Sequence, residues 1–125
     1  MQVVGCGLPK TGTLSLKDAL GILGFKTHHG GDVHGSMDYM KFWVTLLAAD
    51  DDGISDCKGD VDGDGNRIDR SAQIKAHFDR EGFTACCDFP TAAYCEEMLR
   101  AYPEAKFVLT VREPEAWFTS RLRML

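Results

Sequence analysis

The segment at residues 3–16, VVGCGLPKTGTLSL, constrains the fold of this chain more than any other stretch. A short apolar run ends in glycines, a turn through residues 9–13 follows, and a helical pattern begins at once. A strand, a loop and a helix N-terminus in this order direct backbone N–H groups and the positive end of the helix dipole toward one point. The segment therefore predicts an anion site that suits a nucleotide phosphate.

The residues of this loop indicate which kind of nucleotide it suits. A Walker A loop reads G-x-x-x-x-G-K-[ST], with the lysine on the β/γ-phosphates and the hydroxyl on magnesium. Gly7 and Gly12 have that spacing, but Thr13 and Leu14 stand where the lysine and the hydroxyl residue are required. The lysine of the loop is Lys10, two residues before the second glycine. A magnesium-triphosphate enzyme is therefore disfavoured, and a nucleotide kinase or NTPase stays as the alternative.

The composition limits the classes of partner. With 125 residues, 44% hydrophobic and 26% charged, the chain is typical of a single globular domain over residues 1–125. A net charge of −5 argues against a general nucleic-acid binder, because such proteins present a basic surface. The sequence shows neither a charged leader nor an apolar run of membrane-spanning length, so we expect a cytoplasmic protein without a membrane segment.

The cysteines predict a reduced protein. There are five of them, at positions 6, 57, 86, 87 and 95. An odd number with two adjacent members does not indicate a disulfide framework, which favours a reducing compartment. No two of them have C-x-x-C spacing, and this argues against a structural zinc site.

Apolar residues recur at regular spacing along most of the chain. Helical spacing is found after the loop as far as Gly24, over residues 36–49, after an N-cap at Ser71, over residues 92–102, and after Pro114. Apolar runs predict strands at 25–28, 83–87 and 106–111, of which the last is the clearest buried strand. Strands that alternate with helices predict an α/β fold with a mostly parallel sheet.

Two polar stretches offer alternative sites. His28, His29, Asp32 and His34 crowd into a glycine-containing loop, where a metal site is conceivable and a polar loop at the sheet edge is preferred. Residues 50–70 are acidic and rich in glycine, which predicts an exposed insertion.

Part of this insertion resembles a calcium loop. Over residues 60–71, aspartates at positions 60, 62 and 64 and Gly65 match the start of an EF-hand. The match then fails, because Arg67 takes the buried aliphatic position and Ser71 replaces the bidentate glutamate. A non-catalytic calcium-binding module stays as a second alternative, and a solvated insertion is preferred.

Three charged residues each follow an apolar run. Lys10, Asp88 and Arg112 come directly after the strands predicted near residues 3, 83 and 106. In parallel sheets, ligands bind beyond the carboxyl ends of the strands. We therefore expect these three side chains to emerge on one edge of the sheet, beside the anion loop, and to form a single site.

These segments resemble the sulfotransferases that use 3′-phosphoadenosine-5′-phosphosulfate (PAPS) as donor. Residues 9–13, PKTGT, are similar to the family's 5′-phosphosulfate loop. Residues 108–114, VLTVREP, followed by Ser120, resemble its 3′-phosphate-binding segment, in which an arginine precedes a serine by eight residues. The resemblance covers nearly the whole chain except the acidic insertion. It implies a P-loop-type three-layer α/β/α fold.

The resemblance also implies roles for the site residues. A sulfuryl group would pass from PAPS to a hydroxyl or amine of a small-molecule or glycan acceptor, without a metal. Arg112 and Ser120 would bind the 3′-phosphate of the donor, and Asp88 stands where relatives carry a catalytic histidine. His29 lies where relatives place a polar residue facing the acceptor, so it is a second candidate for the base. The 5′-phosphosulfate would lie in a cradle formed by Lys10, Thr11, Gly12, Thr13, Leu14 and Ser15.

The chain departs from the family in its length. It stops about one helix after Arg112, whereas relatives continue with further helices and a basic, glycine-containing segment. We expect from this a sulfotransferase-like domain that is incomplete on its C-terminal side, with an oligomeric state that the sequence leaves open.

Overall fold

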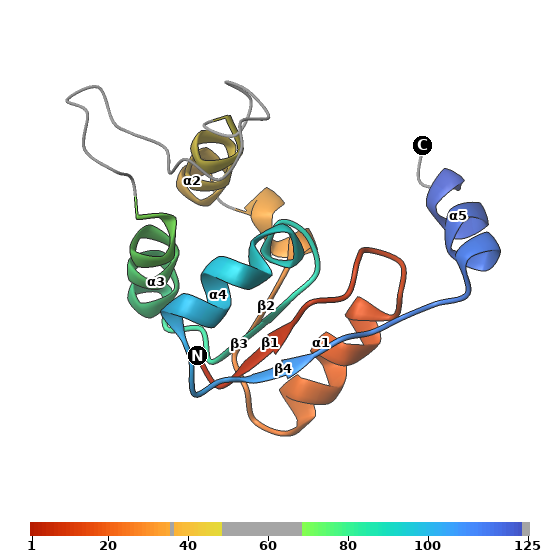
Figure 1. Cartoon of the computed structure of the whole chain (residues 1–125), viewed down its shortest axis with the longest axis horizontal. Coiled ribbons are helices and arrows are strands. Elements are labelled where there is room, and N and C mark those ends of the chain that lie inside the picture. Colours follow the sequence, from red (N-terminus) through yellow and green to blue (C-terminus); the bar gives the residue numbers. More distant parts are fainter. Residues whose placement is uncertain (36, 49–68, 124–125) are drawn as a thin grey trace.

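The computed structural model describes residues 1–35, 37–48 and 69–123 (Figure 1). Strands alternate with helices, as predicted, and η1 and η2 are 3-10 helices. In chain order the elements are β1 (Val3–Gly5), α1 (Thr13–Ile22), β2 (Thr27–His29), η1 (Gly30–Gly35), α2 (Met37–Ala48), α3 (Arg70–Glu81), β3 (Ala85–Cys87), η2 (Thr91–Tyr94), α4 (Cys95–Ala101), β4 (Lys106–Val108) and α5 (Pro114–Leu122).

The strands of the described residues form one parallel sheet in the order β2-β3-β1-β4. Strand β1 lies in the interior of the sheet, with Val4 opposite Cys86 of β3 on one side and Phe107 of β4 on the other. The predicted α/β fold with a parallel sheet is therefore confirmed. Because all strands run in one direction, the segments that follow β1, β2, β3 and β4 leave the sheet at the same edge.

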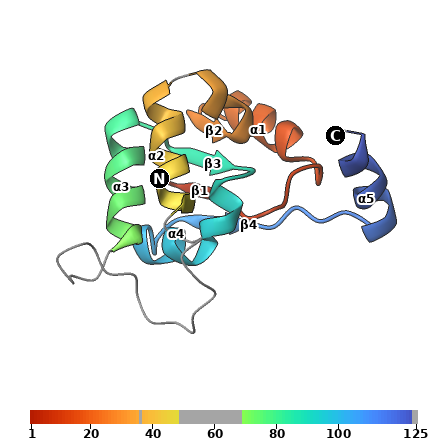
Figure 2. The ribbon, with the colours of Figure 1, turned by 90° about the horizontal axis from the view of Figure 1, so that it is seen from above.

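Helices cover the sheet on both faces, which gives three layers (Figure 2). Alternate residues of a strand point to opposite faces. Val3 and Ala85 accordingly pack against Leu20 of α1, whereas Val4 and Cys86 pack against α2, α3 and α4. None of the helices in the described residues is long and apolar enough to cross a membrane.

The core between the sheet and α2–α4 is aromatic. The His28 ring is fully buried, with ring centroids 5.2 Å from Tyr39, 6.2 Å from Trp43 and 5.4 Å from Phe78. Burial lowers the pKa of His28 to about 3, because the charged ring would lose its hydration. His28 is thus a neutral residue of the buried core.

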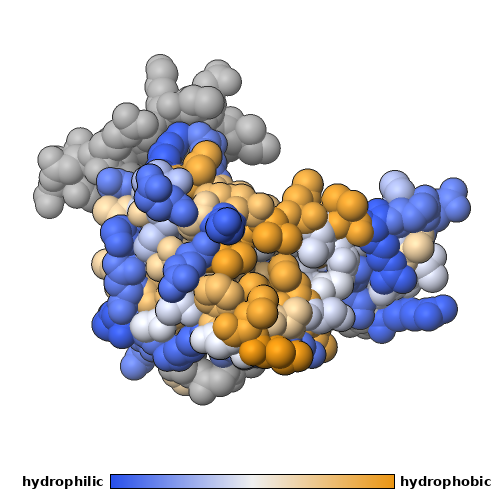
Figure 3. Space-filling view, turned by 90° about the horizontal axis from the view of Figure 1, so that it is seen from below, coloured by the Kyte–Doolittle hydropathy of each residue, from blue (hydrophilic) through white to orange (hydrophobic). Residues whose placement is uncertain are grey.

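Strand β4 differs from the prediction. The run at 106–111 was expected to be a buried strand, but the strand ends at Val108, and Leu109 and Val111 are 68% and 76% exposed. No helix of the described residues covers this part of the sheet, since α5 extends away from the body (Figure 1). Apolar surface consequently lies open on the α1 and β4 side of the molecule (Figure 3).

The start of α3 is also shifted from its predicted place. Asp69, not Ser71, is the N-cap, and its carboxylate accepts a hydrogen bond of 3.1 Å from the amide of Ala72. Ser71 lies inside the first turn, where its hydroxyl is not needed as a cap. Most of the predicted insertion, including residues 60–68 of the resemblance to a calcium loop, lies outside the described residues.

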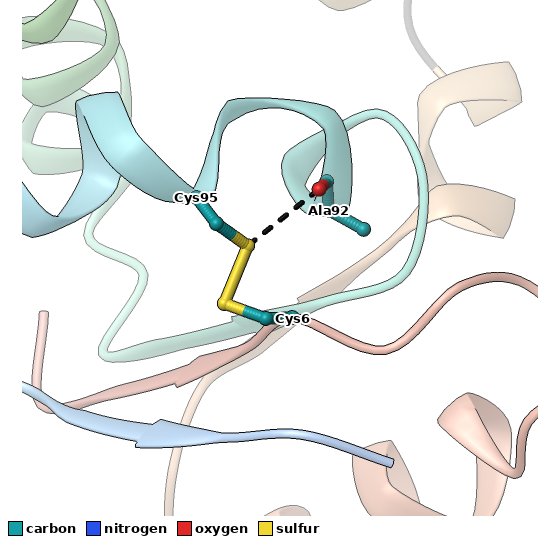
Figure 4. Close-up of a disulfide and its surroundings, with 3 residues drawn as sticks. All are labelled: Cys6, Ala92 and Cys95. Carbon is teal, nitrogen blue, oxygen red and sulfur yellow. Dashed lines mark hydrogen bonds between the residues drawn. A yellow bond between two sulfur atoms is a disulfide. The ribbon is translucent and has the colours of Figure 1, made fainter. Parts of the chain in front are cut away.

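The expectation of a chain without disulfides was wrong. Cys6, directly after β1, is bonded to Cys95 at the start of α4, with their Cα atoms 6.0 Å apart (Figure 4). The two cysteines are 89 residues apart in sequence, so the bond depends on the fold and no local pattern reveals it. Cys86 and Cys87 are free and buried.

Candidate functional site

The loop between β1 and α1 is shaped to leave a helix N-terminus open. Lys10 and Gly12 have positive φ values of 73° and 100°, which turn the chain into α1. Gly12 is the N-cap of α1, and no side chain caps the helix. A Cβ atom on Gly12 would meet nothing within 4 Å. The first N–H groups of α1 therefore have neither an acceptor inside the helix nor a side-chain cap, which is the arrangement of helix N-termini that bind anions.

The segment after β4 holds this loop by three contacts. The hydroxyls of Thr110 and Thr11 are 2.7 Å apart. The Arg112 guanidinium donates to the Lys10 carbonyl at 3.2 Å, and the Trp117 indole N–H donates to the Pro9 carbonyl at 2.8 Å. These contacts place Lys10 and Arg112 on the same edge of the sheet, as the positions of the strands predicted.

A close approach between the loop and the segment after β4 accompanies these contacts. A side chain on Gly7 would overlap the Thr110 hydroxyl, and it would come within 2.8 Å of the Thr110 carbonyl oxygen. The sequence indicated Gly7 only as part of the loop spacing. The local sequence of Thr110 and Trp117 does not show that these residues reach a loop about a hundred residues earlier.

The remaining predicted donor-site residues surround the loop at different depths. Thr13 is buried, Thr11 is half-buried, and Gly12, Leu14 and Ser15 are exposed in and around the first turn of α1. Ser120 is half-buried on α5. Arg112 is exposed, and its planar guanidinium has further N–H groups beside the one bonded to the loop.

Asp88 also lies beside the N-terminus of α1. It follows β3 directly, is 8% exposed, and has a φ of 75°, a value that few non-glycine residues adopt. The Thr13 hydroxyl donates a 3.0 Å hydrogen bond to Asp88 Oδ1. Asp88 and the anion loop thus meet at Thr13, which brings the end of β3 into contact with the end of β1.

His29 completes this side of the site. Its Nε2 lies 3.2 Å from the Thr13 hydroxyl and 3.6 Å from Asp88 Oδ2. Its ring points away from the core that holds His28, because neighbouring residues of β2 face opposite sides of the sheet. The two histidines therefore do not share a set of metal ligands, and no group of metal-ligating residues is found within the described ranges.

Asp32 supports the backbone of His29. One carboxylate oxygen accepts from the His29 amide at 2.9 Å, and the other accepts from the Lys17 ammonium at 2.8 Å. Partial burial works to raise the pKa of Asp32, but the hydrogen bonds from Lys17 and His29 outweigh it and hold the pKa below its ordinary value. Asp32 is therefore an ionised carboxylate that connects α1 to the backbone of His29.

The chain is similar to known proteins over nearly its whole length. A family model described as a sulfotransferase domain matches residues 2–125. Ava biosynthesis cluster protein M from Aspergillus versicolor is 36% identical to the chain over 120 residues. The matched region is 96% of this chain and 41% of that protein, so the chain spans about two-fifths of the length of this curated relative.

Proposed function

This chain belongs to the sulfotransferase domain family, and from that premise we propose that it binds PAPS and transfers its sulfuryl group to an acceptor hydroxyl or amine. Family membership confirms the resemblance drawn from the loop and from the Arg112 segment. The observation that supports the proposal most is the contact between the Arg112 guanidinium and the Lys10 carbonyl, 3.2 Å long. It joins the two segments that a doubly phosphorylated adenosine ligand requires.

The loop fits the 5′-phosphosulfate end of the donor. The open N-terminus of α1 supplies N–H groups, and the space above Gly12 leaves room for an anion. Within the described residues no acceptor lies in hydrogen-bond range of the Lys10 ammonium, which leaves it available to a ligand. In this proposal, Lys10 and the amides of residues 12–15 bind the phosphosulfate, whereas the Thr11 amide donates to the Leu8 carbonyl at 3.3 Å and shapes the loop.

The segment after β4 fits the 3′-phosphate. Arg112 is exposed beside the loop, and Ser120 lies one to two turns into α5, eight residues later. Guanidinium groups bind phosphate through paired, charge-assisted hydrogen bonds. In this proposal Arg112 and Ser120 distinguish PAPS from nucleotides that lack a 3′-phosphate.

The chemistry follows from these positions. As the bond between sulfur and the bridging oxygen breaks, its electron pair stays on the departing phosphate, where Lys10 and the loop amides stabilise the growing charge. The acceptor oxygen or nitrogen forms the new bond to sulfur, and its proton passes to Asp88. None of these steps calls for a metal ion.

Titration with 3′-phosphoadenosine 5′-phosphate by calorimetry tests the donor site. We expect saturable binding that Lys10→Ala and Arg112→Ala each weaken about 10- to 100-fold, because each removes a charge-assisted contact of about 1.5–3 kcal/mol. Arg123→Ala, at the exposed C-terminus of α5, is the matched control and leaves binding unchanged. Absence of saturable binding, or equal binding by Arg112→Ala and the unaltered chain, contradicts the proposal.

The kinase alternative predicts a different nucleotide preference. A magnesium-dependent kinase needs a hydroxyl where Leu14 stands, and the hydroxyl of Thr13 is already bonded to Asp88. We therefore expect adenosine 5′-phosphate and magnesium-ATP to bind more weakly than the 3′,5′-bisphosphate. Magnesium-dependent turnover of ATP would favour the kinase.

A further inference from the structure

We propose that Asp88 alone accepts the proton of the acceptor, and that His29 is a positioning residue which holds Asp88 through the hydroxyl of Thr13. This inference rests on the proposed function, and it assigns separate roles to Asp88 and His29, the two candidates for the base. The supporting observation is a series of hydrogen bonds in which each donor points toward the next group, from the Gly31 amide to His29, from His29 to Thr13, and from Thr13 to Asp88.

The direction of this hydrogen-bond chain is fixed at its first member. The Gly31 amide donates to His29 Nδ1 at 3.1 Å, and a backbone N–H can only donate. His29 Nδ1 is therefore unprotonated, and in the neutral ring the hydrogen is on Nε2. Nε2 then donates to the Thr13 hydroxyl at 3.2 Å, and that hydroxyl donates to Asp88 Oδ1 at 3.0 Å.

This arrangement leaves His29 without a lone pair for an acceptor proton. Nδ1 is occupied by Gly31, and Nε2 already carries a hydrogen that faces Thr13. Asp88, in contrast, uses Oδ1 for Thr13 and has Oδ2 3.6 Å from His29 Nε2. The Asp88 side chain is 12% exposed, so a bound acceptor can reach it. The carboxylate is the group with spare accepting capacity.

The packing around Asp88 supports a fixed carboxylate. A side chain on Gly30 would overlap the Phe89 carbonyl and the Asp88 carboxylate, so the start of η1 and the turn after β3 are in direct contact. The charged groups near His29 are Asp88 from the end of β3, Asp32 from η1 and Lys17 from α1, and the last two are paired with each other. The neutral ring of His28 is directed to the other face of the sheet.

In the proposed step, the O–H or N–H bond of the acceptor breaks and its proton moves to Asp88. The acceptor atom bonds to sulfur, while the electron pair of the broken sulfur–oxygen bond leaves with the phosphate. His29 gains and loses no proton in this step. Its contribution is to keep the Thr13 hydroxyl directed at Oδ1, so that Oδ2 stays directed at the acceptor.

The tautomer of His29 provides a test that does not require turnover. Long-range ¹H–¹⁵N spectra of the full chain, assigned with a His29→Gln variant, report which ring nitrogen carries the hydrogen. We expect His29 with hydrogen on Nε2 and an accepting Nδ1. A ring with its hydrogen on Nδ1 overturns the proposal, since His29 could then accept a proton at Nε2.

Kinetic variants test the division of roles, with 2-naphthol as the acceptor probe and PAPS as the donor. His29→Gln keeps an N–H donor and should lower kcat about 10-fold, whereas His29→Phe removes it and should lower kcat further, both with the KM for PAPS unchanged. The acidic limb of the pH–rate profile should persist in His29→Gln and be absent from any residual rate of Asp88→Asn. Loss of that limb in His29→Gln, with its retention in Asp88→Asn, identifies His29 as the base and overturns the proposal.

Failure of the two proposals can be told apart. A chain that does not bind 3′-phosphoadenosine 5′-phosphate contradicts the proposed function, whatever the state of His29. A chain that binds it, but carries the Nδ1 tautomer, contradicts the assignment of His29 alone. Asp38→Asn, at an almost fully exposed carboxylate on α2, is the matched control for a changed charge and should alter neither readout.

Discussion

The two strands that flank β1, β3 and β4, both belong to apolar runs of the sequence and have very different surroundings. All three residues of β3 are fully buried between α1 and the layer of α2, α3 and α4. In β4, Lys106 and Phe107 are exposed, and the apolar residues that continue the run are still more so. Strand hydrophobicity is thus a guide to pairing in the sheet, whereas burial depends on which helices lie over the strand.

The candidate site includes residues from both the buried region around β3 and the exposed region around β4 and α5. Asp88, Thr13 and His29 belong to the buried side, where packing fixes each side chain. Lys10, Arg112 and Ser120 belong to the exposed side, where Arg112 before α5 and Trp117 within α5 contact the loop. We therefore expect the acceptor side of the site to be rigid and the donor side to depend on ligand contacts.

The two regions should differ most in how much unfolding free energy is lost when a large side chain is truncated to alanine. Phe78→Ala removes a fully buried ring and should lower the free energy of unfolding by about 4 kcal/mol. Phe118→Ala truncates a ring of α5 that is 58% exposed, and it should change the same quantity by less than about 0.5 kcal/mol. Urea unfolding followed by circular dichroism measures both. Similar losses for the two variants would show that α5 is as well packed as α3.

The disulfide connects the loop to the buried side, and its removal should have the next largest effect. A paired Cys6→Ala and Cys95→Ala variant should lose about 3 kcal/mol of unfolding free energy, because the bond closes a long loop of the unfolded chain. Reductant should destabilise the unaltered chain by a similar amount and leave the paired variant unchanged. A reductant effect on both proteins would point to another cause.

Acid should destabilise the buried region specifically. Burial lowers the folded-state pKa of His28 to about 3 and of His77 to about 4, whereas histidines of the unfolded chain titrate near 6.5. Below that pH the unfolded state binds protons that the folded state does not, so stability falls as the pH drops. Between pH 7 and pH 5 the loss should be about 2 kcal/mol for each of the two histidines.

A variant and the distribution of histidines serve as controls for this prediction. His77→Phe preserves stacking on Phe42, whose ring centroid is 3.9 Å away, and should remove about half of the acid sensitivity. Residues 103–123 contain no histidine, so the exposed region contributes nothing to this effect. Unfolding midpoints at a series of pH values measure it, and an unchanged slope in His77→Phe contradicts the assignment.

The smallest effect comes from two helix caps that differ in their surroundings. Asp69 caps α3, and Glu113 caps α5 through a 2.9 Å hydrogen bond from the Ala116 amide. Asp69→Ala should lower the global unfolding free energy by about 1 kcal/mol, because α3 unfolds with the core. Glu113→Ala should increase amide hydrogen exchange in α5 without a shift of the global transition. A global shift in both variants would mean that α5 unfolds with the core.

Much of the fold could be predicted because its signals are local. The strand–loop–helix segment, the alternation of strands and helices, and the start of α5 at Pro114 each depend on a few neighbouring residues. The positions of Lys10, Asp88 and Arg112 after strands were sufficient to place them on one edge of the sheet. The N-cap of α3 was predicted two residues too late, because Asp69 and Ser71 are both acceptable caps and only the backbone decides between them.

The sequence by itself determined which elements form, in what order, and at which edge of a parallel sheet the charged residues emerge. The tertiary structure decided the exposure of β4, the bond between Cys6 and Cys95, and the hydrogen-bond chain that ends at Asp88. The reason is distance along the chain, since Thr13 and Asp88 are 75 residues apart and the two cysteines 89. Such contacts depend on how helices pack across the sheet, and no short stretch of residues carries that information.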